Sequence, residues 1–361
     1  MKIIAFYLPQ FHQIKENDRW WGKGFTEWTN TKSARPLFSG HYQPREPYQD
    51  FYYDLTTPST PSVRKWQAKI AKAYGIYGFC YYHYWFKGKR LLETPFNEVL
   101  KMKEPDFPFC LSWANEPWTK SWDGLDKHIL MPQDYGDISD WKEHFDYLLQ
   151  AFQDERYIYI DDKPLFIIYR PGHIPDCEKM LNYWNALARE NGLKGIYFAE
   201  TLNSFPLPNI NGFDASIQFE PFYTIAHDSS SDINKVIYDS DMQLNVWDYD
   251  KVWMYILQRS LPKKKTFPGA FVDWDNTARR KNANSSIFVG STPEKFTIYL
   301  SKQIHRTYSF YNSEFLFINA WNEWAEGTYL EPDKKYGFSY LEGVKNAIDR
   351  GMKAYKKDES F

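Results

Sequence analysis

Two glutamates that are three positions apart, Glu323 and Glu326, lie in the segment INAWNEWAEGTYLEP of residues 318–332. An apolar run typical of a strand leads directly into this segment, and Gly327 permits a sharp turn after the second glutamate. Two carboxylates in such a turn can face one cavity. Cleavage of a glycosidic bond needs such a pair, with one protonated donor and one ionised base or nucleophile. We therefore expect Glu323 and Glu326 to be catalytic.

A simpler interpretation is that both glutamates cap the following helix or lie in solvent. The neighbouring Trp321 and Trp324 favour the catalytic interpretation, because large apolar rings would bury the carboxylates. Burial and mutual repulsion raise the pKa of one member of such a pair, and this difference separates an acid from a base.

Eight short apolar runs alternate with helical patterns and would position these residues. Runs that are apolar nearly throughout are typical of strands buried on both faces. The predicted strands are Ile3–Tyr7, Ile76–Tyr82, Phe107–Trp113, Leu165–Tyr169, Gly195–Glu200, Ala215–Phe219, Ala270–Asp273 and Phe315–Ala320. This alternation predicts an α/β fold, a (β/α)8 TIM-type barrel with elaborated loops, in a single catalytic domain of residues 1–361. A doubly wound open sheet is the rival architecture.

The predicted barrel has irregular connections. The segment 201–212 is short and proline-rich, so we expect no proper helix there. Residues 13–57 form a long connection, and residues 223–262 should form an elaborated loop followed by a helix.

Polar and aromatic side chains follow every predicted strand. In a barrel of this type the active site lies at the C-terminal ends of the strands. One such residue alone more often packs or caps a helix, whereas their coincidence at eight ends indicates a site. The predicted substrate-binding residues are Tyr7, Gln10, His12, Tyr82, His83, Trp113, Asn115, Glu116, Tyr169, Arg170, Glu200, Glu220, Trp274, Trp321 and Asn322.

The composition indicates the partner class. Aromatic residues make up 19% of the chain, and ring faces beside hydrogen-bonding groups suit carbohydrates. A formal net charge of −2 leaves no basic excess for nucleic acid. No run approaches the ~20 apolar residues of a membrane span. The opening MKIIAFYLPQ enters a strand directly with no signal-peptide pattern, so we expect a cytoplasmic protein.

Metal chemistry has little support in the sequence. Three cysteines without regular spacing form neither a disulfide framework nor a zinc site, so we expect no metal. The pair Asp273 and Asp275 is similar to the D-x-D metal site of nucleotide-sugar transferases, but no nucleotide-binding motif accompanies it.

At WNEWAEGTYLEP the sequence resembles glycoside hydrolase family 99. It is more closely similar to the family-99-like WbsX group of polysaccharide and O-antigen biosynthesis regions, which is often labelled glycosyltransferase. The same resemblance extends to further segments, and together they cover nearly the whole chain. These segments are IAFYLPQFH, WWGKGFTEWTN, GHYQPREP, GFCYYHYWF and SWANEPWT.

This resemblance implies a (β/α)8 endo-α-mannosidase that retains configuration without metal or organic cofactor. The glutamate matching Glu323 would deprotonate the sugar's own 2-hydroxyl, which attacks C1 to form a 1,2-anhydro sugar. The glutamate matching Glu326 would protonate the leaving oxygen and later activate water. Where the family pattern NEWHEG has histidine, this sequence has Ala325. Glu116 also resembles the acid of the large clan of retaining barrels, but it follows the third predicted strand and not the fourth.

Three functions stay open at this point. The leading hypothesis is a glycosidase for α-linked glycans of manno or rhamno configuration. The alternatives are a glycosyltransferase of bacterial polysaccharide or O-antigen biosynthesis, and a non-catalytic carbohydrate-binding barrel. The sugar, the linkage, endo or exo action and the oligomeric state are not specified by the sequence.

Overall fold

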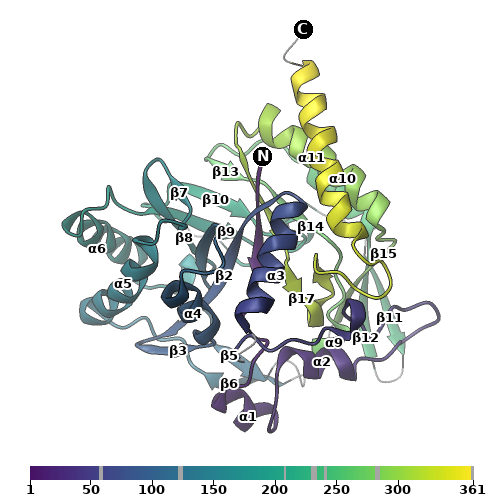
Figure 1. Cartoon of the computed structure of the whole chain (residues 1–361), viewed down its shortest axis with the longest axis horizontal. Helices are drawn as coiled ribbons and strands as arrows, with labels where there is room; N and C mark the ends of the chain where they lie inside the picture. Colours follow the sequence, from purple (N-terminus) through teal and green to yellow (C-terminus); the bar gives the residue numbers. More distant parts are fainter. Residues whose placement is uncertain are drawn as a thin grey trace.

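The computed structural model of the chain has a barrel of parallel strands wrapped by helices (Figure 1). It describes residues 1–56, 60–120, 125–206, 209–228, 234–239, 242–280 and 285–358. The strands of the barrel are β1 (Lys2–Tyr7), β2 (Ile76–Phe86), β4 (Phe109–Trp113), β8 (Lys163–Ile168), β9 (Tyr197–Leu202), β10 (Ala215–Gln218), β13 (Thr266–Phe267), β14 (Gly269–Phe271) and β16 (Phe315–Asn319).

Two of these strands, β13 and β14, act as one strand of the barrel interrupted at Pro268. The hydrogen-bonded order is β13-β10-β9-β8-β4-β2-β1-β16-β14, and every pairing in it is parallel. Thr266 in β13 pairs with β10, and Ala270 in β14 pairs with β16. The first and last strands of this order are therefore adjacent in the chain, and the sheet closes on itself. Pro268 interrupts the ladder between them because proline has no N–H to donate. The predicted (β/α)8 barrel is therefore confirmed, and the open doubly wound sheet is excluded.

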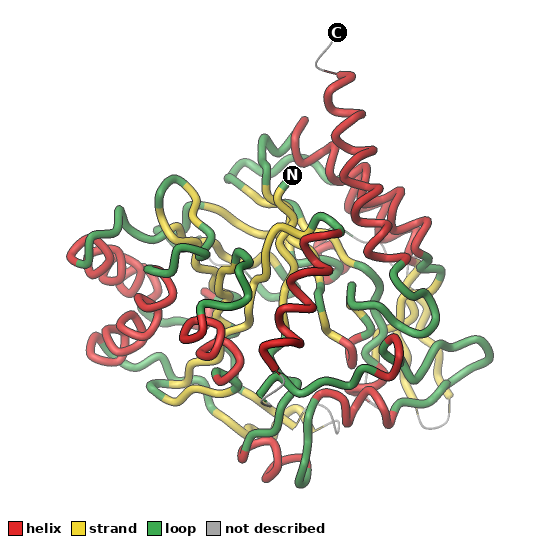
Figure 2. Tube along the Cα trace, in the orientation of Figure 1, coloured by secondary structure: helices red, strands yellow, loops and turns green. Residues whose placement is uncertain are grey.

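Helices surround the strands because one apolar stripe of each faces the sheet (Figure 2). In α5, for example, Phe145, Leu148 and Phe152 are buried and recur at helical spacing, while Asp137 caps the first turn. The longer helices are α3 (Thr60–Ala73), α4 (Thr94–Met102), α5 (Ile138–Phe152), α6 (Cys177–Glu190), α8 (Tyr249–Gln258), α10 (Pro293–Ser309) and α11 (Ser339–Asp358). In the described part of the chain, no helix is both long and apolar enough to cross a bilayer.

The elaborated loops carry short elements at the rim of the barrel. The N-terminal excursion contains α1 (Lys15–Trp21) and α2 (Glu27–Ser33), and α9 (Thr277–Arg280) follows β14. The described residues between β9 and β10 form no helix, as expected. The expectation of a loop plus one helix over 223–262 was incomplete, since the segment also contributes two strands to a small separate sheet. The remaining short elements are α7 (Phe222–His227), β3 (Lys89–Leu91), β5 (Trp118–Lys120), β6 (Leu125–Met131), β7 (Tyr159–Ile160), β11 (Asn234–Asp239), β12 (Met242–Asp248), β15 (Ser285–Val289), β17 (Asn322–Glu323) and β18 (Thr328–Tyr329).

Candidate active site

A cavity of about 650 Å³ opens at the C-terminal mouth of the barrel. Residues that follow or end all eight barrel strands line it, so the whole rim contributes to one site, as is usual for this fold. The lining residues are Leu8, Gln10, Trp21, Tyr82, Tyr84, Ala114, Glu116, Pro117, Trp118, Thr119, Leu130, Tyr169, Arg170, Ser204, Phe205, Phe219, Phe222, Trp274, Asn276, Arg279, Arg280, Glu323 and Glu326.

A tight turn after β16 brings Glu323 and Glu326 to the cavity wall. β17 and β18 pair antiparallel with Glu323 opposite Thr328, which leaves Glu326 inside the turn. Gly327 has a φ of +66°, and a Cβ atom there would lie 2.8 Å from the backbone nitrogen of Asp275. That nitrogen donates a hydrogen bond of 2.8 Å to the carbonyl oxygen of Glu326. Glycine is therefore required at this position, as its place in the sequence suggested.

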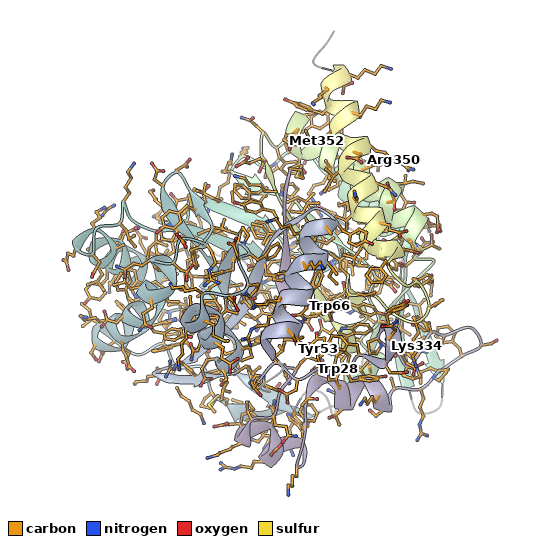
Figure 3. All side chains as sticks on the ribbon, in the orientation of Figure 1. Trp28, Tyr53, Trp66, Lys334, Arg350 and Met352 are labelled. Carbon is orange, nitrogen blue, oxygen red and sulfur yellow. The ribbon has the colours of Figure 1, made fainter. Side chains whose placement is uncertain are left out.

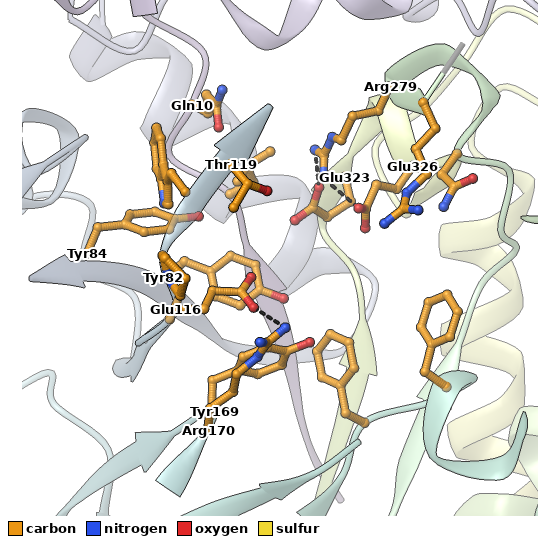
Figure 4. Close-up of a pocket in the computed structure, with 18 of the residues that line it drawn as sticks. Gln10, Tyr82, Tyr84, Glu116, Thr119, Tyr169, Arg170, Arg279, Glu323 and Glu326 are labelled. Carbon is orange, nitrogen blue, oxygen red and sulfur yellow. Dashed lines mark hydrogen bonds and ion pairs between the residues drawn. The ribbon is translucent and has the colours of Figure 1, made fainter. Parts of the chain in front are cut away.

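One guanidinium holds both glutamates. Arg279 in α9 donates from Nη2 to Glu323 Oε2 at 2.9 Å and from Nη1 to Glu326 Oε1 at 2.5 Å. The same side chain also contacts the fully buried carboxylate of Glu27 in α2, with a hydrogen bond of 3.1 Å from Nε. Figure 4 shows Arg279 bridging the two glutamates at one side of the cavity. The two carboxylates therefore share one environment, at the cavity and not away from it.

The charge of Glu323 depends on opposing influences. Burial raises the pKa of Glu323 to about 8, and the negative charges of Glu326 and Glu27 act in the same direction. The Arg279 guanidinium opposes this shift by favouring the ionised form. Burial also raises the pKa of Glu27. Glu323 can therefore hold or release a proton near neutral pH, as acid–base chemistry requires.

A second pair of opposite charge lines another side of the cavity. Glu116 and Arg170 form an ion pair, which Figure 4 shows across the cavity from Glu323 and Glu326. Asn115 fixes this arrangement, since its Oδ1 accepts from the Arg170 backbone N–H at 2.7 Å and its Nδ2 donates to the Arg170 carbonyl at 2.8 Å. Burial raises the pKa of Glu116 and Arg170 opposes it. Glu116 follows the third barrel strand, as its sequence position predicted.

The cavity brings together only part of the predicted set. The predicted residues that line it are Gln10, Tyr82, Glu116, Tyr169, Arg170, Trp274, Glu323 and Glu326. The predicted residues that do not line it are Tyr7, His12, His83, Trp113, Asn115, Glu200, Glu220, Trp321 and Asn322. We therefore do not expect the residues of this second group to contact a substrate directly.

Alternation along β2 explains one of these differences. Successive side chains of a strand point to opposite faces, so Tyr82 and Tyr84 face the cavity and His83 does not. The His83 Nε2 lies 2.8 Å from Nε2 of His144 in α5. Burial lowers the pKa of His83 to about 3, which keeps this ring neutral. The sequence prediction treated the run as a strand end, whereas β2 continues to Phe86.

Other residues of this group are committed to partners behind the cavity wall. The Tyr7 hydroxyl donates to Gln67 of α3 at 2.8 Å, and His12 Nδ1 lies 2.9 Å from the carbonyl of Pro9. Trp113 donates from its indole nitrogen to the Trp85 carbonyl at 3.2 Å.

The two acidic residues of the group are neutralised by basic side chains. Glu200 accepts from Lys264 at 2.7 Å, and Glu220 accepts from Arg259 at the same distance.

Trp321 and Asn322 shape the rim from below. Asn322 makes two hydrogen bonds to the backbone of Leu8, at 2.8 Å to its N–H and 3.0 Å to its carbonyl. Trp321 donates from its indole nitrogen to Glu331 at 3.1 Å. These contacts tie the turn of the two glutamates to the segment after β1, although neither residue lines the cavity.

The sequence prediction missed several lining residues. Arg279 and Arg280 stand in a basic pair after the seventh strand, and Tyr84 shares the face of Tyr82. Strand alternation would have found Tyr84. Arg279 could not be found from spacing, because its partner Glu27 is 252 residues away in the chain. Trp21 and Trp118 belong to segments that carry the family resemblance, but neither was among the predicted substrate-binding residues.

The aspartates of the D-x-D pattern are engaged by basic and polar groups. Asp273 accepts from Arg45 at 3.0 Å, and Asp275 accepts from Gln43 and contacts the His41 ring, both at 2.8 Å. Within the described ranges, no group of three or more His, Cys, Asp and Glu side chains could hold a metal ion. The metal-site interpretation of Asp273 and Asp275 therefore gains no support.

A family model and two curated relatives match nearly the whole chain. The model of the family described as "Glycosyltransferase WbsX" matches residues 3–344. The "Uncharacterized protein WxcX" of Xanthomonas campestris pv. campestris strain B100 is 36% identical over 351 residues, and that of strain ATCC 33913 has the same identity. The matches cover 96% of this chain and 50% of each relative, so the chain spans about half the length of these curated relatives.

Solved structures share the fold. A GH99 endo-α-mannosidase from Bacteroides thetaiotaomicron, in complex with bis-tris propane, superposes with a TM-score of 0.57 at 14% identity, over 98% of both chains. A protein described as "Glycoside hydrolase-like protein" gives a TM-score of 0.59 at 14% identity, over 96% of this chain and 93% of its own. At such low identity the likeness establishes the barrel architecture alone.

Proposed function

The chain belongs to the WbsX family, and from this premise we propose that it is a glycoside hydrolase that cleaves α-linked glycans of manno or rhamno configuration. One observation supports this most strongly: Arg279 holds Glu323 and Glu326 side by side on the wall of a cavity to which all eight strand ends contribute. A pair of neighbouring carboxylates is the minimum equipment for glycosidic cleavage. The GH99 fold of a solved endo-α-mannosidase adds an architectural precedent.

The proposed chemistry uses the sugar's own 2-hydroxyl. Glu323 takes the proton from this hydroxyl, whose oxygen attacks C1 while Glu326 donates a proton to the leaving oxygen. A 1,2-anhydro sugar results, and Glu326 then deprotonates the water that opens it at C1 while Glu323 returns a proton to the 2-oxygen. In an α-mannoside the 2-oxygen and the leaving group are trans, which permits such a displacement. Two inversions at C1 give net retention.

The direct test is turnover of α-linked manno- and rhamno-oligosaccharides by the native chain and by Glu323→Gln and Glu326→Gln. Each substitution keeps shape and removes the acid–base function, so we expect product release to fall by roughly 10²–10⁴-fold. Glu342→Gln, an exposed change on α11, is the matched control and should keep full activity. Unchanged activity in both active-site variants would exclude the assignment.

The neighbouring-hydroxyl step has its own test. An α-mannoside methylated on its 2-oxygen can still enter the cavity but cannot form the anhydro sugar. We expect it to inhibit the enzyme without being cleaved, as measured by chromatography of the reaction mixture. Cleavage of the methylated substrate at an ordinary rate would replace this route with direct attack by a carboxylate.

A glycosyltransferase is the second candidate, because the matched family carries that description. Transfer would require a nucleotide-linked or lipid-linked donor in the same cavity. Calorimetric titration with nucleotide sugars, with and without manganese, separates the two functions. Donor binding together with transfer to an acceptor sugar would favour the transferase, whereas release of free sugar from a glycan favours the hydrolase.

A further inference from the structure

Arg280 differs from the other arginines that line the cavity. Arg170 is paired with Glu116, and Arg279 is shared among the carboxylates described above. The half-buried Arg280 also lines the cavity, and no carboxylate of the described residues lies within ion-pair distance of its guanidinium. The cavity therefore contains one positive charge that the described protein groups leave without a partner.

Unsatisfied hydrogen-bond donors accompany this charge. The indole nitrogen of Trp274, six positions before Arg280, is buried and has no acceptor within the described chain. The side-chain nitrogen of Gln10 is in the same state. Both residues line the cavity and are more than nine-tenths buried, with exposures of 3% and 4%. A buried donor without an acceptor costs about 1–3 kcal/mol, so a ligand that brings acceptor oxygens to these groups would be stabilised by them.

The carboxylates already present in the cavity are engaged elsewhere. The carboxylate of Glu116 is engaged by Arg170, and those of Glu323 and Glu326 are engaged by Arg279. The remaining need is therefore for acceptor oxygens with negative charge. A planar guanidinium binds carboxylate and phosphate groups best, because two parallel N–H···O bonds match their geometry.

From these observations we infer that the part of the cavity lined by Arg280, together with Trp274, is a subsite for an anionic substituent of the glycan, a carboxylate or a phosphate. The substrate class is thus an acidic α-linked glycan and not a neutral one. This inference rests on the proposed function only in taking the ligand to be an α-linked glycan. Binding of the anionic group does not require that the bond be cleaved.

The test compares three methyl α-mannoside probes on the full chain in the Glu326→Gln background, in which turnover is expected to be slow. One probe is neutral, one carries a carboxylate at C6 and one carries a phosphate on O6. We expect the charged probes to bind on the order of tenfold more tightly than the neutral probe, measured by titration with saturation-transfer NMR. The preference should weaken as salt is raised, because screening reduces the charge interaction. A preference for only one charged probe would identify the substituent.

Variants of Arg280 make the test specific. Arg280→Gln should remove the preference, so that charged and neutral probes bind with equal affinity. Arg280→Lys keeps the charge without the two-pronged geometry and should retain part of the preference. The matched control is Arg350→Gln, the same change at an exposed position of α11, where Figure 3 labels the side chain. This control should bind all probes as the parent does.

Three results would overturn the inference. They are equal binding of charged and neutral probes, binding of none of them, and a charge preference that survives in Arg280→Gln. These results differ from failure of the proposed function. A chain that cleaves neutral glycans without preference keeps its hydrolase function and loses the acidic subsite. A chain that prefers charged probes but never releases product keeps the acidic subsite and loses the proposed hydrolase function.

Discussion

At the scale of single residues, the charge of Glu323 connects the stability of the site to its chemistry. Burial favours the neutral acid, whereas Arg279 favours the carboxylate. Glu27 extends this balance, because it shares Arg279 from the fully buried side and has no contact with the cavity. Removal of any one charge should therefore shift the proton equilibrium of the others.

The pH dependence of turnover follows from this balance. In the proposed chemistry Glu323 acts as a base and must be ionised, but burial raises its pKa to about 8. Glu326 must at the same time keep the proton that it gives to the leaving oxygen, so we expect a bell-shaped profile of kcat/KM with one limb near pH 8. Initial rates measured from pH 5 to 9 with an α-linked oligosaccharide provide the check. A rate that does not change between pH 7 and 9, or a limb near pH 8 that persists in Glu323→Gln, would contradict the proposed role of Glu323.

The stability of Glu323→Gln should also depend on pH. The ordinary glutamate pKa is 4.5 and that of Glu323 in the fold is about 8, so the folded chain binds a proton that the unfolded chain releases between these values. The stability of the native chain therefore falls as pH rises through this window. Glutamine carries no charge, and we expect the variant to be more stable by about 4–5 kcal/mol at pH 8.5, with no difference below pH 4.5.

Urea denaturation at several pH values measures this difference, with Glu342→Gln as the exposed control. A variant that is less stable than the native chain at pH 8.5 would show that the ion pair with Arg279 outweighs the burial of charge. A variant that loses activity and gains stability would show that the buried carboxylate lowers the stability of the fold in exchange for function.

Two of the predicted site residues line the cavity for a simple local reason. Glu323 and Glu326 are joined by one turn, so their convergence on a cavity follows from local geometry. Residues such as His83 and Trp113 were predicted to bind substrate because they lie near strand ends. Their true environment depends on which face of the strand they occupy, and the end of β2 was placed too early to assign that face.

At the scale of elements, the turn of residues 323–328 depends on close backbone contact. Gly327 lies against Asp275 of the segment after β14, and the Asp275 N–H donates to the Glu326 carbonyl. The turn that carries the carboxylates and the segment that leads to Arg279 are thus held together at the backbone. This contact sets the distance between Arg279 and its two partners.

Gly327→Ala tests this contact, and Gly337→Ala is its matched control. Both glycines have positive φ, +66° and +54°, so alanine pays a similar conformational cost of about 1 kcal/mol at each. Only at Gly327 would the new Cβ meet backbone, at 2.8 Å from Asp275 nitrogen, whereas nothing lies within 4 Å at Gly337. We expect Gly327→Ala to lose at least about 2 kcal/mol more stability than Gly337→Ala, and most of its activity. Equal effects of the two changes in urea denaturation and rate assays would contradict this.

The strands were predicted well where a continuous apolar run determines the structure. Each of the eight predicted strands overlaps a strand of the barrel, because a strand buried on both faces is apolar throughout. The seventh was predicted at Ala270–Asp273 but lies at residues 266–271, where Pro268 interrupts the ladder. The small sheet of β11, β12 and β15 was missed, since it lies outside the barrel and its segments lack a continuous apolar run.

At the scale of the whole molecule, Glu331 joins parts of the chain that are distant in sequence. Its buried carboxylate accepts hydrogen bonds from Tyr53 at 2.8 Å, Gln67 at 2.7 Å, Trp321 at 3.1 Å and Trp324 at 2.7 Å. Figure 3 labels Tyr53 near one end of α3, the helix that carries Gln67. The N-terminal excursion, the helix after it and the turn that carries Glu323 and Glu326 thus meet at one acceptor.

Glu331→Ala should therefore weaken the whole barrel and not only its rim. The change leaves four buried donors without their acceptor and opens a space between two tryptophans, for an expected loss of about 3–5 kcal/mol. Glu342→Ala on the exposed face of α11 should change stability by less than about 0.5 kcal/mol. Urea unfolding followed by tryptophan fluorescence measures both, and an unchanged slope would show that the barrel still unfolds as one unit. If the two variants unfold at the same urea concentration, the four hydrogen bonds to Glu331 contribute nothing net, and the rim must be held by packing alone.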